Sequence, residues 1–284
     1  MKSTADLEKR IQYLEEENQY LKHLLSDAGI SYSEKEIAGI SNEYDPDQGA
    51  RIISRDITEN DAKVFFSMFW GRTDVYSKRT IKKSTGEVNY YTQCYNFWKN
   101  GCPRVRGSKM KCQDCPRQAY KELKKEQIIE HLRGISEEAT DVIGIFPLLT
   151  DDTCRFIVFD FDNHEKDAEK ADFANTDDKW RDEVDSLRKI CDINGIDALV
   201  ERSRSGRGAH LWIFFQKPIE ASLARKFGKA LLQKGAESVN LRSFRFYDRM
   251  LPMQDHLPEG GVGSLIALPL QGRALKEGNS AFID

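Results

Sequence analysis

Apolar and polar residues alternate with a heptad period at the start of the chain. Residues 3–28 follow this pattern, with Ile11 and Leu14 at its two seam positions. Glu, Lys and Arg fill most other positions, so we expect residues 1–28 to form a helix that pairs with a second copy as a parallel coiled coil. An amphipathic helix packed on its own domain is the alternative. Residues 29–59 are polar and mixed in character, which predicts a linker.

The pattern over residues 60–150 predicts a small α/β module. A short helix is followed by a hairpin whose turn is Lys82–Glu87. A second helix is expected over 117–133, because Gly134 provides a typical cap at its end. The apolar run at 142–149 predicts a strand.

From residue 151 onward, strands and helices alternate regularly. The order β-α-β-β-α-β is that of a ferredoxin-like unit. We therefore expect an α+β fold, with an RRM-like module over residues 151–284. The predicted elements are a strand at 155–161, a helix with Trp180, Val184, Leu187 and Cys191 on one stripe, strands at 198–201 and 209–215, a helix from Pro218 with Ile219, Leu223, Phe227 and Leu231 on one face, and a strand at 265–268.

The chain as a whole is mildly acidic, and one segment of it is basic. The chain has 284 residues, 31% of them charged, and a formal net charge of −3. Basic residues nevertheless gather in the segment 99–125, which predicts a basic face on a mildly acidic protein. No apolar run approaches the roughly 20 residues that cross a bilayer, and no secretory signal is evident. We expect a cytoplasmic protein without a membrane partner.

Two aspartates follow a strongly apolar strand. Asp160 and Asp162 are two residues apart, so on a strand their side chains point to the same face. Phe159 and Phe161 then turn into the core. Paired carboxylates at this spacing suit hard divalent cations such as Mg²⁺ or Mn²⁺. A pair of strand-end acids facing water is the alternative, since the residues after Asp162 are typical of a turn.

A glycine-rich turn separates the next two predicted strands. Gly206 and Gly208 allow a sharp turn that exposes backbone N–H groups, and such a turn can bind phosphate oxygens. His210 opens the returning strand, where its imidazole can donate to a phosphate. A lone histidine on a strand is more often structural, and only its position beside the aspartates makes it a candidate. The turn adds the charged and hydroxyl side chains of Arg204, Ser205 and Arg207.

A site with two metal ions normally needs a third acid. Asp248 and Asp255 are the candidates, because both follow the second predicted helix of the RRM-like module. Each is also compatible with a simple role in a turn beside Pro252 or Pro258.

Four cysteines fall close together, at Cys94, Cys102, Cys112 and Cys115. Without a secretory signal, disulfides are not expected, and four thiolates suit tetrahedral zinc. We therefore predict a zinc knuckle over residues 94–115. An iron–sulfur cluster is the alternative, as is replacement of one cysteine by His131.

Aromatic residues adjoin this cluster. Tyr95, Phe97 and Trp98 lie beside Lys99 and Arg104, a combination that can stack bases and contact phosphates. Packing around the metal is the other explanation for the three rings.

The order of these motifs resembles the archaeo-eukaryotic primase superfamily. An Asp-x-Asp strand, the hairpin Ser-Gly-Arg-Gly-Ala-His and a later single acid follow each other as they do in that superfamily. The finer resemblance is to the primase–polymerase domain of TOTE conflict systems. It covers residues 65–284 and includes the spacing Cys-x7-Cys-x9-Cys-x2-Cys and the segments 144–162, 201–215 and 252–284.

The resemblance implies an archaeo-eukaryotic primase fold, with a ferredoxin/RRM-like catalytic sheet and a zinc-binding insertion. It assigns the first motif to Asp160 and Asp162, the second to His210, and the third to Asp255 in preference to Asp248. These three acids are expected to hold two Mg²⁺ or Mn²⁺ ions. The expected triphosphate contacts are Ser205, Gly206, Arg207, Gly208, His210 and Lys276, with Arg273 as a further cation.

The implied activity is that of a DNA-dependent nucleotidyltransferase, which makes or extends DNA or RNA primers from nucleoside triphosphates. Expected partners are a single-stranded DNA template and primer, a second copy through residues 3–28, and a fused or associated helicase or nuclease. The chain ends abruptly and contains no phosphate loop for an ATP-driven motor, so we expect a piece of a longer protein. A metal-dependent nuclease or phosphoesterase, and a non-catalytic zinc module that binds nucleic acid and dimerises, are the alternatives.

Overall fold

The computed structural model describes residues 11–20, 22, 56–162, 180–238 and 244–283. The chain divides into two compact units, Met1–Arg51 and Ile52–Asp284. In the first unit, residues 11–20 and 22 are helical, and Ile11 and Leu14 expose 56% and 47% of their surface. The remainder of the predicted coiled coil and most of the predicted linker lie outside the described residues, so pairing with a second copy stays a prediction.

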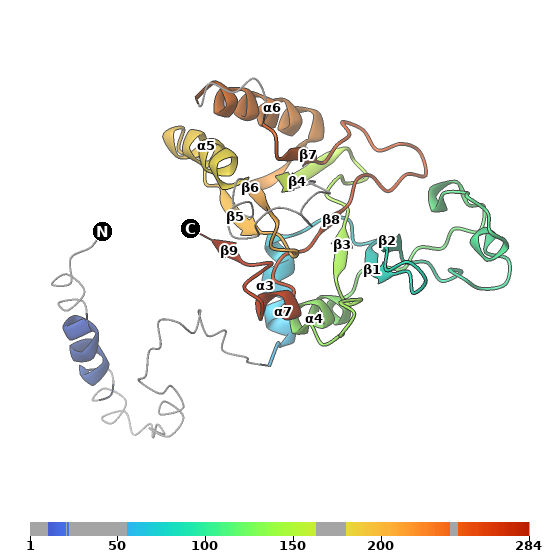
Figure 1. Ribbon diagram of the computed structural model, residues 1–284, viewed down its shortest axis with the longest axis horizontal. Coiled ribbons are helices and arrows are strands. Elements are labelled where there is room, and N and C mark those ends of the chain that lie inside the picture. The colour runs from blue at the N-terminus through green and yellow to red at the C-terminus, as the bar shows by residue number, and fades with distance from the viewer. Residues whose placement is uncertain (1–10, 21, 23–55, 163–179, 239–243, 284) are drawn as a thin grey trace. The chain divides into compact units, whose positions relative to one another are not determined.

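The second unit contains two antiparallel sheets (Figure 1). The strand orders are β2-β1-β3-β8 and β7-β4-β6-β5-β9. No helix in the described part of the chain is long and apolar enough to cross a membrane. In chain order the elements are α3 (Glu59–Met68), β1 (Ser77–Ile81), β2 (Val88–Thr92), the 3-10 helices η1 (Pro103–Arg106) and η2 (Cys112–Asp114), α4 (Lys125–Arg133), β3 (Ile143–Ile145), β4 (Thr153–Asp162), α5 (Trp180–Ile193), β5 (Leu199–Arg202), β6 (Gly208–Glu220), α6 (Ala221–Ser238), β7 (Tyr247–Leu251), β8 (Ile266–Ala267), α7 (Gly272–Leu275) and β9 (Phe282–Ile283).

The β-α-β-β-α-β unit is present, but its last strand is not the predicted one. The fourth strand is β7, which pairs with β4 at one side of the five-stranded sheet. The predicted strand at 265–268 corresponds to β8, which instead pairs with β3 in the four-stranded sheet. The prediction failed because β7 contains Asp248 and Arg249 between apolar residues and shows little apolar character of its own.

Helices α5 and α6 lie side by side over one face of the five-stranded sheet (Figure 1). The predicted stripe of α5 is confirmed, since Trp180, Val184, Leu187 and Cys191 are all buried. Helix α6 begins at Ala221, three residues later than Pro218, because β6 continues through Glu220. Its buried stripe is made largely of small residues, and Leu223 is 55% exposed.

Gly228 explains why small residues face the sheet from α6. A Cβ atom at this position would lie 2.2 Å from the sulfur of Met250 and 3.2 Å from atoms of Ile157 and Phe159. The helix therefore packs so closely that a larger side chain does not fit there. The apolar pattern of α6 could not reveal this choice of face.

Strand β4 is buried on both faces. Ile157, Phe159 and Phe161 point into the core beneath α5 and α6. Phe156 and Val158 point into a second core that includes α3, α4 and the four-stranded sheet. Because side chains alternate, Asp160 and Asp162 continue the second face and come to its end, opposite the four-stranded sheet.

His131 ties α4 to this second core. Its side chain is fully buried, with Nε2 2.9 Å from the carbonyl oxygen of Pro269 and Nδ1 3.2 Å from the backbone nitrogen of Ile143. The Ile143 N–H can donate only to an unprotonated Nδ1, so the ring is neutral with its proton on Nε2. Burial lowers the pKa of His131 to about 4. Both nitrogens are occupied, which excludes His131 as a replacement zinc ligand.

The predicted helix at 117–133 is confirmed only from Lys125 to Arg133, where Gly134 caps it in the left-handed conformation. The preceding residues are extended because their backbone pairs elsewhere. Tyr120 forms an isolated bridge with Cys94, and the N–H of Leu123 donates to the carbonyl of Thr73.

Candidate active site

A pocket of about 210 Å³ lies between the two sheets. Larger grooves of about 460 Å³ occur on the same unit, but their walls are mainly apolar. The smaller pocket brings together four of the residues that the sequence predicted for metal and phosphate binding, namely Asp160, Asp162, Ser205 and His210. Its polar wall contains Asp160, Asp162, Arg204, Ser205, His210 and Arg249, and the facing wall contains Tyr90 from β2 and Ile266 from β8.

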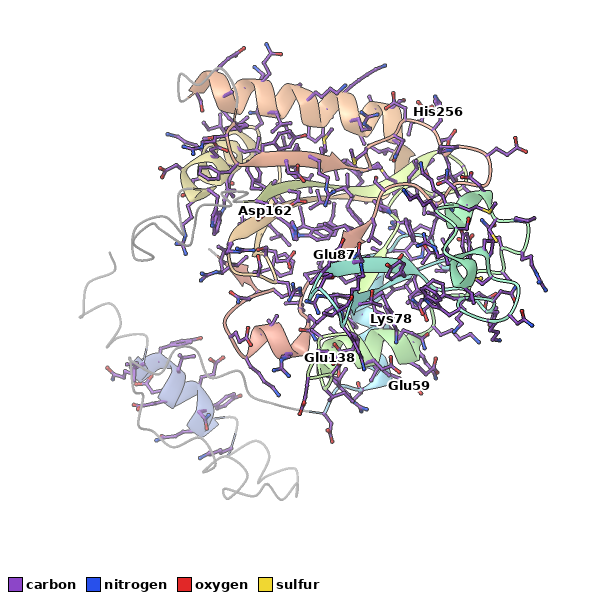
Figure 2. All side chains as sticks on the ribbon, turned by 45° about the vertical axis from the view of Figure 1, so that its right-hand side comes forward. Glu59, Lys78, Glu87, Glu138, Asp162 and His256 are labelled. Atoms are coloured by element: carbon purple, nitrogen blue, oxygen red, sulfur yellow. The ribbon has the colours of Figure 1, made fainter. Side chains whose placement is uncertain are left out.

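Four charged or titratable side chains form a row across the five-stranded sheet. Asp160 on β4 is paired in register with Arg249 on β7 and with His210 on β6. His210 is in turn paired with Glu201 on β5. Paired residues on neighbouring strands project from the same face, so the order is Arg249, Asp160, His210, Glu201. Asp162, labelled in Figure 2, lies at the end of β4 on this same face.

His210 lies between two carboxylates. Its Nδ1 is 2.9 Å from Oε2 of Glu201, and its Nε2 is 3.5 Å from Oδ1 of Asp160. Burial by itself lowers the pKa of His210, but the charges and hydrogen bonds of Glu201 and Asp160 together raise it to about 10. The imidazole is therefore protonated at neutral pH and places a positive charge in the pocket wall.

Glu201 is the last residue of this row and is buried, with only 1% of its surface exposed. Its Oε2 accepts from His210 and also from Nε1 of Trp212, at 3.0 Å. Its Oε1 accepts from the Ser280 hydroxyl, at 3.4 Å. These contacts fix the imidazole so that Nε2 faces Asp160 and the pocket.

Asp160 is 8% exposed and carries a negative charge. Burial alone raises the pKa of Asp160, but His210 and the guanidinium of Arg249 lower it below its usual value. Nε of Arg249 lies 3.2 Å from Oδ2 of Asp160. An ionised carboxylate beside Asp162 at the pocket wall has the oxygen chemistry that Mg²⁺ and Mn²⁺ favour, so these residues fit the predicted metal.

The turn between β5 and β6 approaches the aspartates closely. Gly208 is paired with Asp162, and a Cβ atom at position 208 would lie 2.1 Å from the carbonyl oxygen of Phe161. Gly206 has a φ of 75°, which favours glycine. The turn is closed by the Ser203 N–H, which donates to the Gly208 carbonyl at 2.8 Å. Glycine is therefore required here both for the turn and for the contact with β4.

Asp248, not Asp255, lies close to Asp160. Nε of Arg249 is 3.6 Å from Oδ2 of Asp248 as well as 3.2 Å from Asp160, so one guanidinium nitrogen contacts both carboxylates. Asp255 instead forms an ion pair with Arg225 on α6, at 2.6 Å, and neither Asp248 nor Asp255 is part of the pocket wall. The third acid therefore stays a prediction: the family resemblance favours Asp255, whereas the contacts of Arg249 favour Asp248.

The predicted phosphate contacts divide into two groups. Ser205 lines the pocket, and Gly206 and Gly208 form the turn behind it. Arg207 and Lys276 are exposed and are not in the pocket wall. Arg273 lines a neighbouring pocket, together with Arg204.

The four cysteines are free and half-buried. Two of their sulfurs accept backbone N–H groups. Burial raises the pKa of Cys102, but the amides of Arg104, Trp98 and Val105 lower it overall. Sγ of Cys94 accepts from the N–H of Asn96, at 3.4 Å. The lowered pKa of Cys102 favours its thiolate, which is the form that binds zinc.

Tyr120 lies near two members of the cluster. Burial, followed by the charges of Cys112 and then Cys94, raises the pKa of its phenol to about 12. Even so, in the part of the chain that the structure describes, no group of three or more His, Cys, Asp or Glu side chains is arranged to hold a metal ion. Zinc stays a prediction.

Three residues of this site were missed by reading the sequence. Glu201 could have been found, because a turn centred near Gly206 pairs it with His210. Arg249 required the register of β7, for which the sequence shows no signal. Tyr90 belongs to the other sheet, and only tertiary packing brings it to the pocket.

Comparison with known proteins identifies the family. The family model described as the TOTE conflict system, Archaeo-Eukaryotic Primase domain, matches residues 60–284. No match was found among curated proteins. Among solved structures, the polymerase domain of Mycobacterium tuberculosis Ligase D in complex with DNA is 14% identical, with a TM-score of 0.46, over 76% of this chain and 78% of that one. By the family match, this chain belongs to the archaeo-eukaryotic primase domain family of TOTE conflict systems, a primase–polymerase family of nucleotidyltransferases.

Proposed function

We propose that this chain is a primase–polymerase that joins nucleoside triphosphates into a strand on a single-stranded DNA template. The observation that carries the proposal is the meeting of Asp160, Asp162 and His210 at one pocket, next to the turn that contains Ser205. A pocket with two carboxylates on one side, and a histidine and a glycine-rich turn with Ser205 on the other, suits a metal-bound triphosphate better than a neutral ligand.

In this proposal the carboxylates bind metal ions, and the basic groups bind phosphates. Asp160 and Asp162 hold Mg²⁺ or Mn²⁺, and Asp248 is the third acid. When bound, such ions neutralise the triphosphate and lower the pKa of the attacking 3′-hydroxyl. Arg249 contacts both Asp160 and Asp248, so its guanidinium holds the two carboxylates in place.

His210, Ser205 and Arg204 hold the phosphates. The Nε2–H of His210 faces the pocket because Glu201 occupies Nδ1. Ser205 lines the same pocket. Catalysis by such a site depends mainly on positioning and on electrostatic stabilisation of the charge that develops on the leaving phosphates.

The cysteine-rich segment contacts the template. Tyr95 and Trp98 are 54% and 59% exposed, and Nζ of Lys121 lies 5.7 Å from the ring centroid of Tyr95. Exposed rings flanked by cations suit stacked bases and backbone phosphates of a single strand. Zinc bound by the four predicted cysteines stabilises this segment, which has few apolar residues of its own.

A primer-extension assay tests the proposed activity. The chain is incubated with a template, with or without a primer, with labelled ribo- or deoxyribonucleotides and with Mg²⁺ or Mn²⁺. Longer products support the primase–polymerase. Shortened template supports a nuclease, and unchanged nucleic acid supports a non-catalytic binding module. The variant D160N/D162N should fold as the wild type does and lose all synthesis.

A matched pair of variants tests the third acid. We expect Asp248→Asn to reduce the rate of synthesis by a factor of about 10² to 10³, as removal of one electrostatic group in an active site typically does. Asp255→Asn removes only a partly exposed ion pair with Arg225, worth roughly 0.2–1 kcal/mol, and should leave synthesis nearly unchanged. The reverse outcome would restore Asp255 as the third acid.

Two partners belong to the same proposal. Residues 3–28 pair with a second copy as a coiled coil, and a helicase or nuclease acts with the chain, fused or associated. Light scattering of the full chain and of a chain lacking residues 1–28 tests the first partner. A monomer in both cases would exclude the coiled-coil dimer.

A further inference from the structure

A second polar pocket adjoins the aspartate pocket. It also measures about 210 Å³, and Arg204 lines both pockets. Arg79 on β1 and Gln271, both buried, form its inner wall, while Arg273 is exposed. Three carboxylates, from Glu137, Glu138 and Glu277, also line this pocket, and all three residues are exposed.

Arg79 is a buried cation with an incomplete set of partners. It exposes only 7% of its surface. Its Nη1 donates to the carbonyl oxygens of Glu138 and Ala139, at 2.6 and 3.4 Å. Its Nε is buried and has no hydrogen-bond partner, and among the residues that the structure describes Arg79 forms no ion pair. A buried, unpaired charge is costly, so an anion that completes these contacts would be bound favourably.

A second guanidinium lies close to the first. Burial lowers the pKa of Arg79, and the positive charge of Arg204 lowers it further. Two neighbouring cations repel each other unless an anion lies between them. Two neighbouring guanidinium groups are typical of a phosphate-binding site, since each planar guanidinium can bind phosphate oxygens with two N–H donors.

Tyr90 connects the two pockets. It is paired in register with Arg79 across β1 and β2, and it lines the aspartate pocket. Burial raises the pKa of Tyr90, whereas the charges of Arg204 and Arg79 both act to lower it. Both guanidinium groups thus lie near one phenol. Arg204 lines both pockets, so a phosphate beside His210 in the first pocket lies next to the pocket that contains Arg79.

We propose that the pocket around Arg79 and Arg204 binds a phosphate group of a nucleotide held in the aspartate pocket. The inference rests on the proposed function and deepens it, because it adds a phosphate contact from the four-stranded sheet. The phosphate belongs either to the incoming nucleoside triphosphate or to the 5′ end of the strand being started. The carboxylates of Glu137, Glu138 and Glu277 are solvent-screened, so the buried guanidinium dominates the inner wall.

Binding of tripolyphosphate, measured by calorimetry without divalent metal, tests this site independently of synthesis. We expect Arg79→Gln to weaken the affinity at least tenfold and Arg79→Lys to weaken it less, because lysine keeps the charge but lacks the planar donors. The variant D160N/D162N should bind as well as the wild type or more tightly. Arg188→Gln, which removes a cation on α5, is the matched control and should change nothing.

Unchanged tripolyphosphate binding in a folded Arg79→Gln would overturn the proposal. If that variant does not fold, Arg79→Lys replaces it; a smaller loss of affinity is expected, and unchanged binding would again overturn the proposal. Arg79-dependent binding in a protein that synthesises nothing would leave the phosphate site standing and refute the primase–polymerase.

Synthesis assays then distinguish the two sources of the phosphate. A raised KM for the nucleoside triphosphate with a nearly unchanged kcat, on a primer with a 5′-hydroxyl, assigns the site to the incoming nucleotide. A defect seen only when the strand starts from a 5′-triphosphate assigns it to the starting end. An Arg79→Gln enzyme with wild-type kinetics in both assays would overturn the inference.

Discussion

Replacing Glu201 by glutamine isolates the charge that holds His210. The two side chains have the same shape. In Glu201→Gln the amide oxygen can accept from Nδ1 of His210 and Nε1 of Trp212, as Oε2 does now, and the amide nitrogen can donate to the Ser280 hydroxyl. All three contacts survive, and only the negative charge is lost.

The expected size of the effect follows from the loss of the carboxylate charge beside the imidazolium. An opposite charge within about 4–6 Å typically shifts a pKa by about 1–3 units. Burial of His210 lowers its pKa, and without the carboxylate charge of Glu201 only Asp160 opposes that effect. We therefore expect its pKa to fall from about 10 by at least about one unit.

The pKa of His210 is measured by NMR titration of its imidazole without divalent metal. Glu183→Gln is a matched control, because Glu183 is also buried and accepts from the backbone N–H groups of Arg245 and Phe246. It should leave His210 unchanged. A pKa within a few tenths of the wild-type value in Glu201→Gln would show that Asp160 alone raises it, and would refute the role given to Glu201.

Three further predictions concern stability and metal. The pKa of His131 is about 4 in the folded chain and 6.5 in the unfolded one, so the unfolded state binds more protons between these values. Urea titrations should therefore show that the free energy of unfolding falls by up to about 3 kcal/mol from pH 6.5 to pH 4. The variant His131→Asn should remove this part of the pH dependence. Gly208→Ala places a methyl group against the Phe161 carbonyl and should reduce the free energy of unfolding by about 1–3 kcal/mol in urea titrations. The purified chain should contain about one zinc ion by elemental analysis, and C112S/C115S should lose it.

Each of these has a control and a contradicting outcome. His256→Asn, at an exposed histidine, should keep the His131-dependent pH slope; the same slope in His131→Asn would contradict the assignment. Gly86→Ala introduces strain without a clash and should cost less than Gly208→Ala. Buried Cys154 lies apart from the cluster, so Cys154→Ser should retain zinc, and zinc retained without Cys112 and Cys115 would exclude them as ligands.

The residues Asp160, Asp162 and His210 could be found from the sequence because short-range rules govern them. Alternation along a strand puts the two aspartates on one face, and a glycine turn brings the following strand back beside them. Most of the elements around them were also predictable, since their apolar periods are clear. The start of α4 was not, because residues 119–123 pair with distant backbone rather than continue a helix.

The sequence by itself therefore determined the two neighbouring strands that carry Asp160, Asp162 and His210, and the family that these motifs indicate. Tertiary structure decided where the two candidates for the third acid lie. The family resemblance favoured Asp255, but β7 pairs with β4 and brings Asp248 beside Arg249, while Asp255 pairs with Arg225. Tertiary structure also decided the place of Arg79, because its strand β1 is far in sequence from the turn that carries Arg204. Pairing between distant strands depends on how whole surfaces pack, and no local pattern of residues encodes it.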